Sequence, residues 1–138
     1  MIENSEASRS VNEKSGDARS KNQEVGVGRS RDIADVPAVE VVSTAALHLM
    51  SAAAVQLGLA EDLPDHQDLD EARSLIEALA GLVTAATPRL GHHHAAPLRD
   101  GLKTLQLAFR ECSGIQDAPG DGPGEKLTGP VYVAATPK

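Results

Sequence analysis

Residues 41–60 form a stretch of twenty amino acids without a single Asp, Glu, Lys or Arg. A helix that is uncharged on all sides must be covered over most of its surface, or it must lie in a membrane. The stretch is long enough to span a bilayer. However, Ser43, Thr44 and His48 interrupt it, and no basic cluster or aromatic belt flanks it. We therefore expect a buried helix of a soluble protein, and keep membrane association through residues 41–60 as an alternative.

The expected limits of this first helix follow from its end signals. Asp35 is a good N-cap and Pro37 falls in the first turn, where its missing N–H has no intrahelical acceptor. The helix should continue to about Leu57. Gly58 is then expected to end it in a left-handed conformation.

A second helix is predicted from a capping-box pattern, because Glu71 follows Asp68 by three residues. Apolar residues then recur at steps of three and four, which is typical of an amphipathic helix. Gly81 is expected to weaken the helix slightly and to allow a neighbouring backbone to come close. Pro88 predicts its end. The apolar positions are Leu69, Ala72, Leu75, Ile76, Leu79, Leu82, Val83 and Ala86.

A third helix is expected to open at Pro97 and to end at Gly114. Its apolar residues form a heptad-like stripe. The short connection, residues 88–96, favours an antiparallel hairpin with the second helix. The stripe consists of Leu98, Leu102, Leu105, Phe109 and Cys112.

The two ends of the chain differ in composition from the middle. Residues 1–35 are mostly polar with scattered apolar side chains, and we predict that they are disordered. Residues 114–138 hold five Gly and four Pro, which predicts an extended Gly/Pro-rich C-terminal tail, free of the helices. The prediction is therefore an all-α protein: a helical domain over residues 36–113, with an apolar first helix and an antiparallel helical hairpin, flanked by disordered termini.

Few side chains suggest chemistry. His92, His93 and His94 invite a metal site, but adjacent loop residues rarely aim three imidazoles at one ion. His48 lies one turn before Ser51, yet that helix offers no carboxylate to orient the ring. We predict no catalytic, cofactor-binding or metal-binding residues and no enzymatic activity. The alternative is an accessory subunit or small enzyme that uses His48 or the loop of residues 92–94.

Composition points instead to a binding role. Phe109 and Tyr132 are the only aromatic residues, so the core is thin and self-association or a protein partner should cover the first helix. The net charge of −7 argues against direct nucleic-acid binding. The single cysteine and the absence of a continuous apolar run in residues 1–31 indicate a cytoplasmic protein. The interface candidates are Leu47, Met50, Leu98, Leu102, Leu105 and Phe109.

Several stretches also carry a family resemblance. They read VVSTAALHLMSAAA at residues 41–54, DLDEAR at 68–73, PLRDGL at 97–102, LQLAFRE at 105–111 and GPGEKLTGP at 122–130. This pattern resembles the actinobacterial branch of the family catalogued as domain of unknown function 1844. The resemblance implies a short helical protein of no established activity, so it transfers no site residues. It also suggests a translation-linked context, because the gene in actinobacteria often lies near that of a translation initiation factor.

Overall fold

The computed structural model describes residues 33–131 of the chain, which divides into two units, residues 1–37 and 38–138. In the first unit the described part, residues 33–37, contains a turn in which the Val36 amide donates to the Ile33 carbonyl (3.0 Å). The predicted disorder of residues 1–35 therefore falls almost wholly outside the described residues. In the second unit the helices are α3 (Ala38–Gln56), α4 (Leu69–Leu90), α5 (His92–Cys112) and α6 (Glu125–Thr128).

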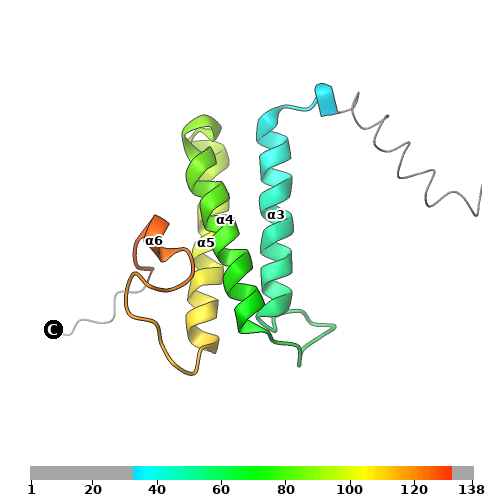
Figure 1. Cartoon of the computed structure of the whole chain (residues 1–138). Coiled ribbons are helices and arrows are strands. Elements are labelled where there is room, and N and C mark those ends of the chain that lie inside the picture. Colours follow the sequence, from blue (N-terminus) through cyan, green and yellow to red (C-terminus); the bar gives the residue numbers. More distant parts are fainter. Residues whose placement is uncertain (1–32, 132–138) are drawn as a thin grey trace, which may run out of the picture. The chain divides into compact units, whose positions relative to one another are not determined.

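The three long helices pack against one another, and each runs antiparallel to the next along the chain (Figure 1). Within residues 38–131 all regular structure is helical. The predicted fold class is thus confirmed: an apolar first helix beside an antiparallel helical hairpin.

The first predicted helix corresponds to α3, which begins at Ala38, directly after Pro37 and slightly later than expected. Its end agrees with the prediction. Gly58 has a φ of +85°, and its amide donates to the Val55 carbonyl (3.0 Å), while the Leu59 amide donates to the Ala54 carbonyl (3.0 Å). This pair of hydrogen bonds is the Schellman motif, which satisfies carbonyls that the helix end would otherwise leave unpaired.

The start of α4 is fixed by Asp68. Its side chain accepts a hydrogen bond from the Glu71 amide (3.1 Å), as the capping pattern predicts. The Asp68 amide in turn donates to the carbonyl of Gln56, the last residue of α3 (2.7 Å). The end of α3 and the start of α4 are therefore held together by the backbone.

The predicted loop over residues 88–96 is wrong. Pro88 lies inside α4 and Pro97 inside α5, and only Gly91, with a φ of +81°, separates the two helices. Each proline in a helix lacks the N–H that would donate to the carbonyl four residues before it. That carbonyl belongs to Thr84 for Pro88 and to His93 for Pro97. Both residues are exposed, so water can satisfy these carbonyls and the helices continue through the prolines.

The core lies between α3, α4 and α5 and contains small side chains on α3 and larger ones on α5. The close approach that we expected at Gly81 is absent, since nothing lies within 4 Å of a Cβ built there. It occurs instead at Gly101 of α5, where an added Cβ would lie 2.8 Å from Sδ of Met50. The buried apolar residues are Ala46, Ala53, Leu57, Ala72, Ile76, Leu79, Ala80, Val83, Leu90, Ala95, Leu98, Leu102, Leu105 and Phe109.

The C-terminal segment, residues 114–131, also differs from the prediction of an extended tail free of the helices. It folds back along the helices and forms α6, which packs on α4 (Figure 1). Gly122, Pro123 and Gly124 are buried there. Residues 132–138 of the predicted tail lie outside the described residues.

Candidate functional site

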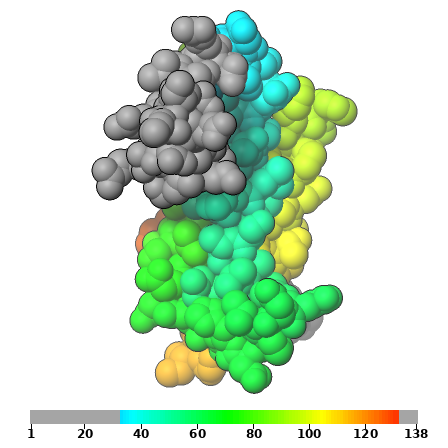
Figure 2. Space-filling view, turned by 90° about the vertical axis from the view of Figure 1, so that its right-hand side faces the viewer, coloured from blue at the N-terminus to red at the C-terminus, as the bar shows by residue number. Residues whose placement is uncertain are grey.

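The outer face of α3 is a solvent-exposed strip without charged side chains. Only Ala46 and Ala53 of this helix are buried. Leu47 keeps 57% of its surface exposed and Val41 keeps 46%. In Figure 2, α3 runs down the middle of the visible surface. We define the outer face by its exposed residues Val41, Thr44, Ala45, Leu47, His48 and Ser51.

This helix is also long and apolar enough to cross a membrane, judged by length and composition, with a mean hydropathy of 1.6. Its inner face, however, packs on α4 and α5. Its two sides thus differ in environment although they hardly differ in polarity. That combination is typical of a surface that is covered in an assembly.

The six predicted interface residues differ in their exposure to solvent. Leu98, Leu102, Leu105 and Phe109 lie in the chain's own core, so a partner has no access to them in this fold. Met50 is half-buried and faces Gly101 of α5. Leu47 alone lies on the outer face of α3.

The histidines singled out in the sequence are solvent-exposed. His48 lies on the outer face of α3. His92, His93 and His94 form the first turn of α5 rather than a loop, and the rings of His93 and His94 meet edge to face at 5.3 Å. Within residues 33–131 no group of three or more His, Cys, Asp or Glu side chains is placed to hold a metal ion.

A buried ion pair, which the sequence analysis missed, attaches the C-terminal segment to α5. Arg110 is 3% exposed and Glu125 is 2% exposed. Nε and Nη2 of Arg110 donate to the two oxygens of Glu125 at 2.7 and 2.9 Å. Arg110 also donates to the carbonyls of Asp117 (2.8 Å) and Ala118 (2.9 Å), and the Gly120 amide donates to Glu125 (3.0 Å).

These contacts control the ionisation of Glu125. Burial raises the pKa of its carboxyl group, but the hydrogen bond from Arg110, the hydrogen bonds from the Gly120 and Gly122 amides and the guanidinium charge together lower the pKa below its ordinary value. Glu125 is therefore ionised at neutral pH. A buried pair with this many hydrogen bonds is well compensated for its loss of hydration.

Arg73 of α4 adds a second attachment. Its guanidinium lies 4.9 Å from the ring centroid of Phe109 and donates to Asp117 at 2.8 Å. The C-terminal segment is thus bound by cationic side chains from both helices of the hairpin. The sequence gives one weak sign of the buried ion pair. Gln106 and Arg110 are four residues apart beside the apolar stripe, and both side chains are buried.

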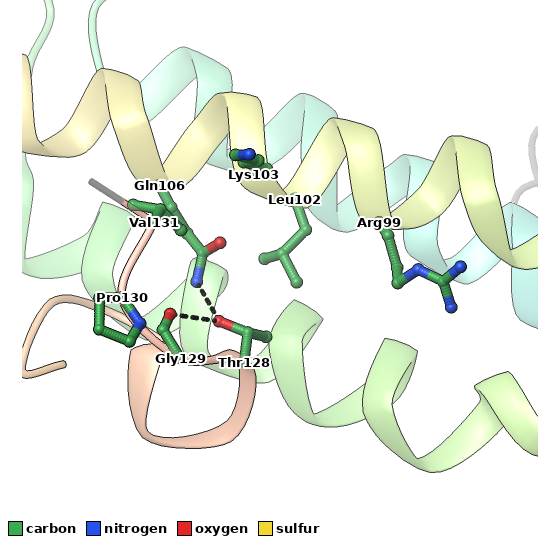
Figure 3. A pocket seen from close by; sticks show the side chains of 8 residues that line it. All are labelled: Arg99, Leu102, Lys103, Gln106, Thr128, Gly129, Pro130 and Val131. Carbon is green, nitrogen blue, oxygen red and sulfur yellow. Dashed lines mark hydrogen bonds between the residues drawn. The ribbon is translucent and has the colours of Figure 1, made fainter. Parts of the chain in front are cut away.

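A cavity of about 190 Å³ lies between α5 and the C-terminal segment (Figure 3). Gln106, 1% exposed, forms part of its wall. Nε2 of Gln106 donates to the Pro123 carbonyl (3.0 Å) and to the Thr128 hydroxyl (3.2 Å). Arg99 and Lys103 of α5 line the same cavity.

These elements define a small all-α protein: a three-helix core with a C-terminal segment bound across its hairpin. The family model described as Domain of unknown function (DUF1844) matches residues 38–111, more than half of the chain, and the chain belongs to this family. The match covers α3, α4 and nearly all of α5, and it ends before α6. No curated protein and no solved structure matches the chain.

Proposed function

We propose that this chain is a non-enzymatic helical interaction protein that forms a homodimer through the outer face of α3. The observation that carries the proposal is the contrast within this helix. Residues 41–60 contain no charged side chain, yet only Ala46 and Ala53 of α3 are buried within the chain. A partner that covers the outer face would remove exposed apolar surface, such as that of Leu47, from water.

The absence of charge on the outer face of α3 suits a second copy of the chain as this partner. The chain has a net charge of −7, so most surfaces of two copies repel each other. The outer face of α3 carries no charge, and a surface that covers it must also be uncharged, because an unpaired buried charge is costly. A second α3 meets that condition, and a two-fold axis would place the same face on both sides of the interface.

Side-chain size is consistent with such a pairing. Thr44, Ala45 and Ser51 are small, so two helix backbones can approach to within the ~8–10 Å of closely packed helices. Leu47 would then insert beside the partner helix. Insertion of α3 into a membrane instead would strip its inner face from α4 and α5, where Ala46 and Ala53 are fully buried.

The test is sedimentation equilibrium of the full-length protein at micromolar concentration. We expect a dimer. The variant Ala45→Glu buries a carboxylate in the interface and should weaken dimerisation by about a hundredfold or more. The matched control is Ala85→Glu, the same substitution at an exposed position of α4, which should leave the dimer intact.

A wild-type protein that stays monomeric at these concentrations contradicts the proposal. So does an equal effect of both substitutions. If the monomer instead co-sediments with phosphatidylcholine vesicles and Ala45→Glu abolishes this, the outer face of α3 is a membrane-binding surface. A cytoplasmic location and a translation-linked context stay predictions from the sequence.

A further inference from the structure

We propose that the cavity between α5 and the C-terminal segment binds a small hydroxylated carboxylate with a short apolar chain. The proposal does not depend on the role of α3. It rests on the direction of one buried amide, on two cations beside it and on the apolar part of the cavity wall (Figure 3).

The buried amide belongs to Gln106. Its Nε2 must face Pro123, because a proline carbonyl accepts but cannot donate. The amide oxygen is therefore turned away from Pro123, and in Figure 3 it points into the space on the Leu102 side. Among the described residues none donates to this oxygen. No side-chain nitrogen or oxygen that is fully buried lacks a partner within residues 33–131, so this oxygen is open to the cavity. A ligand that displaces water from it must supply an O–H or N–H donor.

The cations are Arg99 and Lys103, one turn apart on α5. Both are exposed, and neither forms a salt bridge within residues 33–131. Lys103 precedes Gln106 by three residues, so the two side chains leave the same face of α5 about 5–6 Å apart. A carboxylate with a hydroxyl on the neighbouring carbon spans this separation: the carboxylate meets Lys103, and the hydroxyl donates to Gln106. The guanidinium of Arg99 lies beyond Leu102 in Figure 3 and adds positive charge at the far end of the cavity.

The charge of Arg99 and Lys103 also favours a hydroxyl over an ammonium group as the hydrogen-bond donor of the ligand. An ammonium group beside the carboxylate would bring a third positive charge to the same rim, whereas a hydroxyl is neutral. The remaining wall includes Leu102 and Pro130, which suit a short hydrocarbon chain. At about 190 Å³ the cavity is smaller than the ~300–1,000 Å³ of typical drug-sized sites, so the ligand is small.

The experiment is a titration of the full-length, ¹⁵N-labelled protein, in which binding is monitored through the NMR chemical shifts of its amide groups. The probe is L-2-hydroxyisocaproate. We expect saturable shifts at the Gln106 side-chain amide and at the Thr128 backbone amide, with a millimolar dissociation constant. Isocaproate lacks the hydroxyl and should bind about tenfold more weakly, as expected for one lost hydrogen bond. Isohexanol lacks the carboxylate and should give no saturable shift.

The test variant is the double substitution Arg99→Gln and Lys103→Gln. Both residues are exposed, so the fold should persist, and binding should be lost. Arg89→Gln, at an exposed position of α4, is the matched control and should bind normally. Circular dichroism melting checks that both variants are folded.

Three results would overturn the proposal: shifts that do not saturate, equal shifts in the double variant, or equal affinity for the acid and the alcohol. Tighter binding of L-leucine than of L-2-hydroxyisocaproate would refute the assigned hydroxyl.

Discussion

Two elements are attached to the α4–α5 hairpin in opposite ways. α3 packs through small apolar side chains, with Ala46 and Ala53 completely buried and Met50 against Gly101. The C-terminal segment is held by the ion pair of Arg110 and Glu125 and contributes little apolar surface to the core. The first attachment depends on shape, and the second on a few hydrogen bonds. The composition of an element thus shows what it can bury, but not which hydrogen-bonding partners its neighbours offer it.

This comparison predicts that a single substitution releases the C-terminal segment. Glu125→Ala leaves the Arg110 charge buried without its carboxylate and should lower the free energy of unfolding by about 3 kcal/mol or more. Urea unfolding of the full-length protein measures it. The control is Lys126→Ala, which removes an exposed partner of Asp121 and should change stability by less than about 1 kcal/mol. Similar values for the two variants would contradict the assigned role of the buried pair.

The segment also depends on shape at one position. Gly124 has a φ of +76°, and a Cβ added there would lie 2.6 Å from Cβ of Ala80. Gly124→Ala should therefore cost about 2 kcal/mol or more, from left-handed strain and from the clash. Gly129→Ala is the matched control, since Gly129 has a φ of +88° with nothing within 4 Å. A cost for Gly124→Ala no greater than that for Gly129→Ala would show that the contact with Ala80 is loose.

The packing of α3 is tested by two helical glycines. Gly81→Ala should stabilise the protein by about 1 kcal/mol, because the added methyl meets nothing and alanine favours the helix. Gly101→Ala should give a smaller gain, because Sδ and Cε of Met50, each 2.8 Å away, must move. Met50 is flexible, so this difference is modest. Thermal unfolding compares the two variants; an equal gain would mean that α3 is not pressed against α5.

The last prediction concerns the dependence of stability on pH. The folded state lowers the pKa of Glu125 below 4.5, so the ionised carboxylate stabilises the fold above that pH. This contribution is lost as the pH falls further, through the lowered folded pKa. Glu125→Gln should therefore show a shallower loss of unfolding free energy on acidification than the wild type. Urea unfolding between neutral pH and about pH 3 tests this; identical slopes would exclude a stabilising ionised Glu125.

The helical core was predictable from local signals, each of which acts within one turn. The end of α3 follows from the left-handed backbone of Gly58, whose amide donates to the carbonyl three residues before it. The start of α4 follows from the Asp68 side chain, which accepts from the amide three residues after it. The stripe from Leu98 to Phe109 has the spacing of a buried face, and it is buried. The stripe packs within its own chain rather than against a partner, because the buried side chains of α3 are small alanines that let the helices pack closely. Periodicity alone does not distinguish these two outcomes.

The C-terminal segment could not be predicted in the same way. Its glycines and prolines indicate a high entropic cost of ordering, and that inference is sound. What offsets the cost is a pairing between Arg110 and Glu125, fifteen residues apart, together with Gln106 and Pro123. No local sequence pattern predicts these contacts. The prolines were misleading for a related reason: Thr84 and His93, whose carbonyls lose a helical donor at Pro88 and Pro97, are exposed only as a result of the fold.

The single residue between α4 and α5 limits how this fold can vary. With Gly91 alone as the joint, the two helices have no slack, so neither can slide along the other by a turn without breaking the reversal. Changes of length are therefore better tolerated between α3 and α4, where residues 57–68 provide a longer span.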